Sequence, residues 1–235
     1  MRNAAPDSRN SGLRSGFVSE TNMPTATTAR MLNLSRLDTV PLQNEPFQYL
    51  LVEDFLQPDC KQEVLEDFPS IDRNGSFPLF TLTPGPAFTR LVDELLDKEF
   101  EIAVGRKFEM ELSRYPTMIT VRGRCSGASD GGIHTDSKDK IITVLLYLNP
   151  GWENAGGRLR LLRSRNLDDY VAEVPPTMGS LLIFKRCDHS FHGHLPFEGK
   201  RMSLQMNWVK SERYLRQEQF RHRISSWVKR LTGRG

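Results

Sequence analysis

A histidine and an aspartate one residue apart, His134 and Asp136, follow two glycines and precede an apolar run in the stretch GGIHTDSKDKIITVLLYLNPGW, residues 131–152. In an extended segment alternate side chains point to the same face, so these two share one face and Thr135 takes the other. An imidazole nitrogen and a carboxylate oxygen can then bind one metal ion. Such a pair also arises by chance in solvated loops, so its meaning depends on partners elsewhere in the chain.

A third metal ligand has to come from a distant segment. The stretch CDHSFHGHLPFEGKRMSLQMNW offers three histidines, His189, His192 and His194. Two imidazoles and one carboxylate on one face of Fe(II) leave three coordination positions open, as in non-haem iron oxygenases. A chelating cosubstrate can occupy two of these positions and dioxygen the third, whereas protein ligands close a structural metal site.

A chelating 2-oxo acid with a distal carboxylate also needs a cation several ångströms from the metal. Arg201 lies nine residues after the middle histidine, and the planar fork of arginine holds a carboxylate bidentately. Ser203 shares a strand face with Arg201 and can donate a further hydrogen bond. On the strand after the His-x-Asp loop, Tyr147 shares a face with Thr143 and Leu145, so its hydroxyl can reach the same carboxylate, although it can equally be a core aromatic.

Composition places these residues in an ordinary soluble domain. The chain has 235 residues, of which 38% are hydrophobic and 26% charged. No apolar run is long enough for a membrane span, and no secretory signal is visible. The three cysteines, Cys60, Cys125 and Cys187, are widely spaced and odd in number, which favours a reducing compartment over a disulfide framework. We therefore expect a cytoplasmic protein.

The charge is uneven along the chain. Residues 211–235 carry seven Lys/Arg against two Glu, a charge of +5, so residues 1–210 carry −2 of the total of +3. The main body is thus not a basic nucleic-acid-binding surface, and no nucleic-acid partner is expected. The basic segment 211–235 is predicted to be an amphipathic helix docked on the domain, with membrane or nucleic-acid binding as the alternative. Its apolar face comprises Phe220, Ile224, Trp227, Val228 and Leu231.

The N-terminal segment, residues 1–30, is poor in apolar residues and rich in Ser, Thr, Asn and Arg. A segment of this composition cannot bury enough surface to offset chain entropy, so it is predicted to be a disordered tail. The alternatives are a transit peptide, weakened by Asp7 and Glu20, and an overextended start codon, since Met23 and Met31 follow.

The remaining chain, residues 31–210, is predicted to form one domain that is mainly β with flanking helices. Two helices are expected, over 59–68 and over 87–100, where Phe88, Leu91, Leu95, Leu96 and Phe100 recur at helical spacing. Short apolar or alternating runs separated by turn residues then favour an antiparallel fold, and a double-stranded jelly roll fits them best. These runs are residues 117–123, 141–149, 157–164, 179–186 and 201–209.

The order HTD, YLN, GGRLRLL, GSLLIFKR and SFHGHLPFEGKR resembles the Fe(II)- and 2-oxoglutarate-dependent dioxygenases, and within them the prolyl 4-hydroxylase-like branch. The resemblance covers residues 45–210 and is strongest over 118–209. One departure is Arg122, where related hydroxylases often have a tyrosine. The resemblance implies a double-stranded β-helix, iron ligands His134, Asp136 and His192, and 2-oxoglutarate ligands Arg201 and Tyr147.

Among the three histidines, the nine-residue gap to Arg201 favours His192 as the ligand, while His189 is expected to cap a turn and His194 to line the substrate mouth. The resemblance implies an enzyme that hydroxylates an unactivated C–H bond, with release of succinate and carbon dioxide. Its cofactors would be Fe(II) and 2-oxoglutarate, with ascorbate as a further candidate. A peptidyl proline or similar group is the expected substrate. The alternatives are a small molecule, sugar or lipid, or a non-catalytic metal-binding sensing module.

Overall fold

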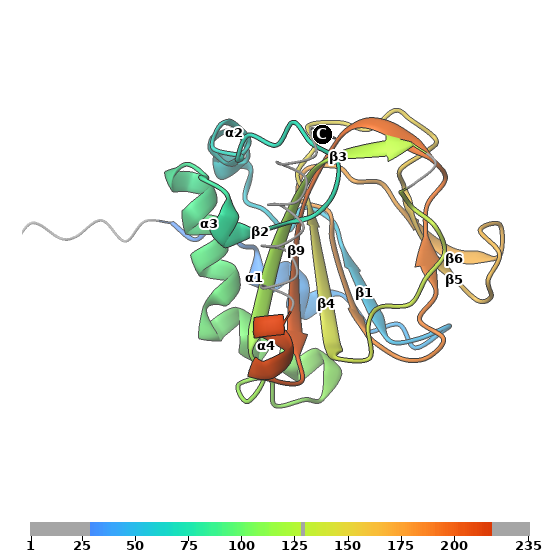
Figure 1. Ribbon diagram of the computed structural model, residues 1–235. Helices are drawn as coiled ribbons and strands as arrows, with labels where there is room; N and C mark the ends of the chain where they lie inside the picture. The colour runs from blue at the N-terminus through green and yellow to red at the C-terminus, as the bar shows by residue number, and fades with distance from the viewer. Residues whose placement is uncertain (1–28, 128–129, 218–235) are drawn as a thin grey trace, which may run out of the picture.

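A computed structural model describes residues 29–127 and 130–217, and its strands form two antiparallel sheets (Figure 1). The larger sheet has six strands and the smaller has three. In spatial order the larger sheet contains β1 (Tyr49–Val52), β7 (Leu181–Lys185), β4 (Lys140–Tyr147), β9 (Phe197–Val209), β3 (Thr117–Gly127) and β2 (Phe77–Pro78). The smaller contains β6 (Tyr170–Val174), β5 (Leu159–Leu162) and β8 (His192–Gly193).

This arrangement is the predicted double-stranded β-helix. Each of the five predicted strand runs overlaps a strand of the structure, namely β3, β4, β5, β7 and β9, although β3 and β9 are each four residues longer than their run. β4 lies between β7 and β9 in the centre of the larger sheet, and its pairing with β9 sets Thr143 opposite Asn207 and Tyr147 opposite Ser203. Because paired residues point to the same face of a sheet, this register brings side chains from two distant segments together.

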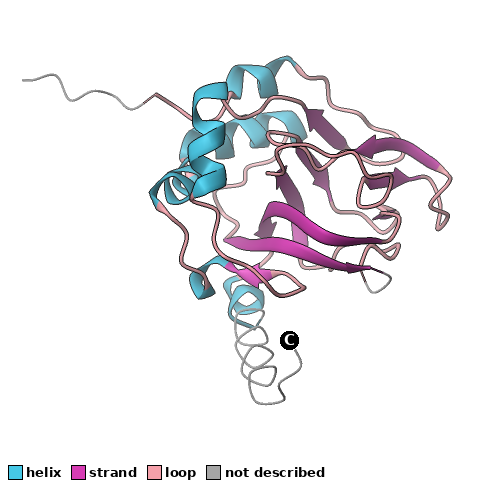
Figure 2. Ribbon diagram, turned by 90° about the horizontal axis from the view of Figure 1, so that it is seen from above, coloured by secondary structure: helices cyan, strands magenta, loops and turns pink. Residues whose placement is uncertain are grey.

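The helices cover the outer face of the larger sheet, whereas the smaller sheet lies on its other side (Figure 2). Apolar residues of the helices and of that outer face form one core cluster, and a second cluster fills part of the space between the sheets. The helical segments are α1 (Leu34–Thr39), η1 (Pro58–Cys60), α2 (Lys61–Glu66), η2 (Leu79–Thr81), α3 (Pro86–Leu96) and α4 (Lys98–Phe108).

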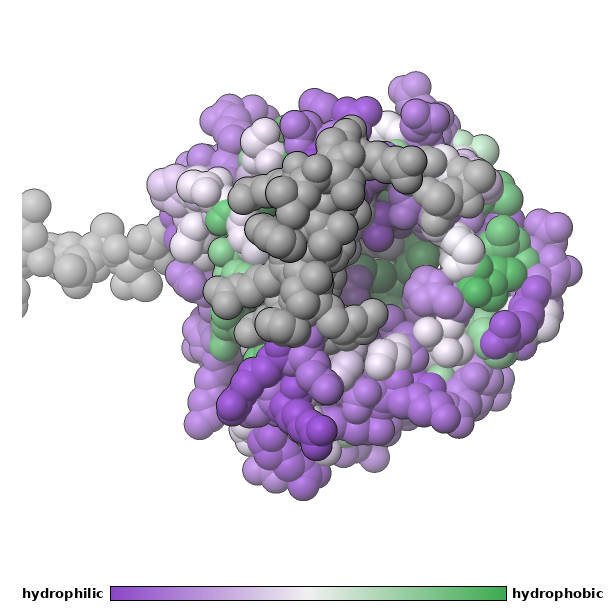
Figure 3. Space-filling view, in the orientation of Figure 1, coloured by the Kyte–Doolittle hydropathy of each residue, from purple (hydrophilic) through white to green (hydrophobic). Residues whose placement is uncertain are grey.

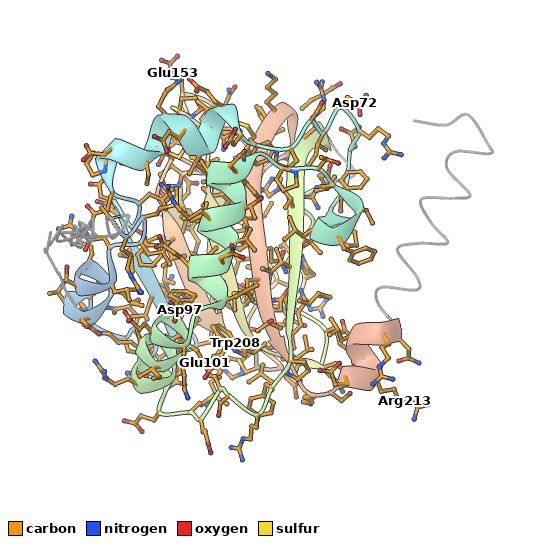
Figure 4. All side chains as sticks on the ribbon, turned by 90° about the vertical axis from the view of Figure 1, so that its left-hand side faces the viewer. Asp72, Asp97, Glu101, Glu153, Trp208 and Arg213 are labelled. Carbon is orange, nitrogen blue, oxygen red and sulfur yellow. The ribbon has the colours of Figure 1, made fainter. Side chains whose placement is uncertain are left out.

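The helix predicted over 87–100 is in fact two helices. Asp97 has an extended backbone, with φ −67° and ψ 147°, and its side chain accepts a hydrogen bond from the backbone of Glu99, so it ends α3 and caps α4. Leu96 is consequently 46% exposed rather than part of the buried face. Phe100 belongs to α4 and stacks on the buried Trp208, with ring centroids 6.2 Å apart. Figure 4 labels Trp208.

At the N-terminal end, the folded domain includes the last residue of the predicted tail. Arg30 forms ion pairs with Asp97 and Glu99, and the backbone N–H groups of Met31 and Leu32 donate to Glu94. Of the predicted tail, Ala29 is also described, whereas residues 1–28 lie outside the described residues.

At the C-terminal end, residues 212–217 are helical, and the Ser211 hydroxyl caps this helix by accepting from the Tyr214 N–H at 3.2 Å. The predicted apolar face over 220–231 lies outside the described residues. Within the described ranges, no helix is long and apolar enough to cross a membrane.

Candidate metal and cosubstrate site

The loop that follows β3 and the strand β8 meet at two histidines. His134 and His192 form an isolated antiparallel bridge, in which each backbone N–H donates to the carbonyl of the other residue at 3.0 Å. Their rings lie 4.4 Å apart, centroid to centroid. The backbone bridge therefore fixes two imidazoles from distant segments beside each other.

Asp136 completes a group of three possible metal ligands. One ligand atom each from His134, Asp136 and His192 lies within 4.8 Å of the other two. Nδ1 of His134 is 2.9 Å from the Gly132 carbonyl, and Nδ1 of His192 is 3.0 Å from the Ser190 carbonyl. A ring that donates from Nδ1 to a carbonyl keeps Nε2 unprotonated, so both rings can present Nε2 to an ion.

The Asp136 carboxylate is held by two donors from β4. Lys140 Nζ donates to one oxygen at 2.8 Å, and the Thr143 hydroxyl donates to the other. Thr143 in turn accepts from Asn207 Nδ2 at 2.8 Å, and Asn207 accepts from Gln205. Burial alone would raise the pKa of Asp136, but the charges of Lys140 and His192 and the two hydrogen bonds outweigh it and lower the pKa. The carboxylate is thus ionised and fixed in orientation, as a metal ligand requires.

The three histidines of the second motif differ in environment. Burial lowers the pKa of His192 to about 4, so the ring is neutral near pH 7 and free to bind a metal. His189 is exposed and is not part of the ligand group. His194 is buried in the cavity wall, where its Nδ1 contacts the Leu195 carbonyl at 2.8 Å. A Cβ at Gly131, where φ is +93°, would lie 2.4 Å from that nitrogen, so only glycine fits this turn.

The candidate ligands open into a cavity of about 130 Å³ between the two sheets. Figure 3 shows the molecule hollowed in this region, with apolar side chains in the hollow. Strand parity is borne out on β4 and on β9, since alternate residues of both strands line the cavity. These residues are Thr143, Leu145 and Tyr147 on β4, and Arg201, Ser203 and Gln205 on β9.

Arg201 lies in the cavity wall and is 5% exposed. Its Nε donates to the Gly157 carbonyl at 2.8 Å, one terminal nitrogen donates to the Tyr147 hydroxyl at 3.4 Å, and the guanidinium lies over the Tyr147 ring. Burial raises the pKa of Tyr147, although Arg201 opposes the shift, so the phenol stays protonated. Within the described part of the chain, the Ser203 hydroxyl and Arg201 Nη1 make no hydrogen bond, which leaves donors for an anion in the cavity.

Arg122, the position that departs from the resemblance, also lines the cavity. Its guanidinium donates to the Asp130 carboxylate at 2.9 Å, so an opposite charge already balances it. In contrast, no described carboxylate pairs with Arg201. Of the two cavity arginines, Arg201 is therefore the better partner for an incoming carboxylate.

Sequence reasoning missed the residues that hold Asp136. It assigned no role to Lys140, whose side chain is mostly buried and paired with the carboxylate. It placed Thr143 on the correct face without a role and did not single out Asn207. The four-residue spacing of Asp136 and Lys140 offers a weak signal for their pair, but the contact of Thr143 with Asn207 depends on the register of β4 against β9.

The comparisons with known proteins fit this geometry. The sequence model described as the 2OG-Fe(II) oxygenase superfamily matches residues 123–210, the segment that contains all the candidate ligands. Over this segment the chain is similar to that superfamily. A search of the curated proteins finds no match for this chain.

Solved structures share the fold of this chain. A prolyl-4-hydroxylase from Pseudomonas putida aligns with a TM-score of 0.50 and 20% identity, over 76% of this chain and 97% of that one. A prolyl 4-hydroxylase from Phytophthora capsici aligns with a TM-score of 0.52 and 16% identity, over 79% of this chain and 68% of that one. At these identities the likeness concerns the fold, not the substrate.

The matching sequence model describes oxygenases that use Fe(II) and 2-oxoglutarate, and the residues present here fit both groups. Two imidazoles and an ionised carboxylate on one side of a cavity are the donor set of non-haem Fe(II) oxygenases. A buried arginine with donor capacity to spare stands in the same cavity, as a distal carboxylate requires.

Proposed function

We propose that His134, Asp136 and His192 bind Fe(II), that Arg201, Tyr147 and Ser203 bind 2-oxoglutarate, and that the enzyme hydroxylates an unactivated C–H bond of a peptidyl proline or similar group. The observation that carries the proposal is the single cavity that all six side chains line. Bound iron and 2-oxoglutarate supply the oxidising chemistry, with release of succinate and carbon dioxide.

The protein residues would orient the reactants and exclude water. The backbone bridge and the Asp136 hydrogen bonds fix the metal ligands on one side, leaving the opposite side open to the cosubstrate. Arg201 and Ser203 would receive the distal carboxylate, and the Tyr147 hydroxyl would add one more hydrogen bond. Leu145 and Leu159 line the cavity and reduce access of water.

The size of the cavity supports a substrate that stays mostly outside. At about 130 Å³ it is smaller than the roughly 300–1,000 Å³ of typical small-molecule sites, and the cosubstrate itself must occupy much of it. A substrate that presents one protruding group, such as the ring of a proline in an extended peptide, meets this restriction. A free small molecule, sugar or lipid is the alternative.

Three further features belong to the proposal. Residues 31–210 would be the catalytic domain, between an N-terminal tail and a basic C-terminal helix. The three cysteines are free, which supports a reducing compartment such as the cytoplasm. Ascorbate would maintain the iron in its reduced state during turnover.

The test measures succinate formation from 2-oxoglutarate with Fe(II), ascorbate and a library of proline-containing peptides, with a mass gain of one oxygen on the peptide. Arg201→Ala should lose succinate formation, while His189→Ala, at an exposed histidine outside the ligand group, serves as the control. Succinate and a hydroxylated peptide would support the proposal. Succinate with an unmodified library would point to the small-molecule alternative, and metal binding without succinate would point to the sensing module.

A further inference from the structure

The larger sheet has an apolar pocket at its edge, away from the iron and cosubstrate residues. A cavity of about 210 Å³ is lined by residues 78–80, by Leu96 at the end of α3 and by residues 117–119 at the start of β3. Phe80 and Leu96, at 50% and 46% exposure, are among the most exposed large apolar side chains in the described ranges. Exposed apolar groups gathered around a concave surface indicate that another segment binds there.

The same place is an open edge of the sheet. β2 pairs only with Thr120 and Val121, through Pro78 and Phe77. On that side, residues 117–119 of β3 have no strand partner within the described chain, while β9 pairs with their other side. Proteins usually cover an apolar edge strand with a helix or loop, because an open one can pair with other chains.

The described chain ends beside this pocket. The Val209 N–H donates to the Pro116 carbonyl at 2.9 Å, and Trp208 pairs with Thr117, so β9 ends next to the start of β3. Figure 4 shows the helix that carries Arg213 beside the same end of β3. Residues 218–235 follow directly, and their sequence places Phe220, Ile224, Trp227, Val228 and Leu231 on one helical face.

We propose that residues 218–235 dock as an amphipathic helix in the pocket lined by residues 78–80, Leu96 and 117–119. In a helix, Phe220 and Leu231 are about 16 Å apart, enough to cover the roughly 7 Å of strand in residues 117–119 together with the flanking side chains. The cations of the segment would lie on the outer face in water, and the exposed Asp93, one turn before Leu96 on α3, would lie near them.

The short connection favours this segment over other occupants. Only ten residues separate Val209 from Phe220, so the local concentration of the apolar face at the pocket is far above that of a second protein.

Docking also has a consequence for the cavity between the sheets. Because β3 carries Arg122 into that cavity, a helix along its edge would stabilise one of the cavity walls.

Amide hydrogen exchange at residues 117–119 tests the proposal directly. In the full chain these amides should exchange at least about tenfold more slowly than in a chain ending at Gln217. Trp227→Glu in the full chain should give the fast exchange of the shortened chain. Ser226→Glu introduces the same charge at the neighbouring position on the polar face, and it should retain the slow exchange.

Reciprocal changes on the pocket complete the test. Leu96→Glu should accelerate exchange at residues 117–119, whereas Ile102→Glu, at an equally exposed apolar residue of α4 outside the pocket, should not. Equal exchange in all these chains would overturn the proposal. So would protection that rises with protein concentration together with a dimeric mass, which would indicate a second copy, or protection that requires anionic lipid vesicles.

Discussion

Replacing Thr143 by valine should weaken metal binding about 10–100-fold, the usual effect of removing a hydrogen-bond partner of a metal ligand. Thr143 is 1% exposed, donates to Asp136 and accepts from Asn207 Nδ2. Valine has nearly the same shape, so the packing is retained while both hydrogen bonds are lost. Lys140 remains paired with the carboxylate, and therefore weakened rather than abolished binding is expected.

The same substitution should also lower the free energy of unfolding, for a separable reason. Asn207 is fully buried, and without Thr143 its Nδ2 has no partner in the described chain, which costs about 1–3 kcal/mol. Thr143→Val/Asn207→Leu removes both polar groups, so this double variant should recover part of the stability. It should not recover metal affinity, because Asp136 still lacks its donor.

Competition of the protein with a chelating dye for Mn²⁺ or Co²⁺ would measure the metal affinity. Urea denaturation of the metal-free protein would measure the free energy of unfolding. Thr143→Ser keeps the hydroxyl and is the matched control, with near-normal metal affinity. Loss of the donor also removes one of the influences that lower the pKa of Asp136. In Thr143→Val, protons should therefore begin to compete with the metal ion for Asp136 at a higher pH. If Thr143→Val bound metal as tightly as the unaltered protein, the hydrogen bond would have no role in orienting the ligand.

Alanine at each proposed metal ligand should abolish iron-dependent turnover and leave the fold intact; these ligands are His134, Asp136 and His192. His189→Ala should retain iron. Circular dichroism would check the fold of each variant, and analysis of bound iron would check its metal content. Arg201→Lys should weaken 2-oxoglutarate binding much more than iron binding, because a point charge replaces a bidentate fork. Tyr147→Phe should lose at most about 1.5–3 kcal/mol of 2-oxoglutarate binding free energy. Titration calorimetry would measure iron binding and 2-oxoglutarate binding separately for each variant. Burial lowers the pKa of both His192 and His194 to about 4, below the value of about 6.5 in the unfolded chain. Below pH 6.5 the unfolded chain therefore binds more protons than the folded protein. The free energy of unfolding of the metal-free protein should fall by about 2 kcal/mol per histidine between pH 7 and pH 5. His194→Gln should remove about half of that loss in urea denaturation at the two pH values, and an unchanged loss would contradict the burial argument.

Strand parity explains how much of the site is predictable from the sequence. A period of two is independent of the partner strand, so alternation put Arg201 and Ser203 on one face of β9, and Tyr147 on the face of β4 that Thr143 and Leu145 share. Periodicity was less reliable in the helices. Apolar spacing continued through Asp97, although that residue ends one helix and caps the next, and only its side-chain hydrogen bond to the Glu99 N–H marks the break.

The parts of the site that the sequence did not reveal depend on contacts between distant segments. The spacing between His134 and His192 says nothing of the backbone bridge that joins them, and a one-residue change in the register of β4 against β9 would separate Thr143 from Asn207. The charge on Asp136 depends on the same register, since Thr143 contributes to its low pKa only while it faces the carboxylate. Ligand identity can thus be inferred from motif spacing, whereas ligand orientation and protonation follow from the pairing of the strands.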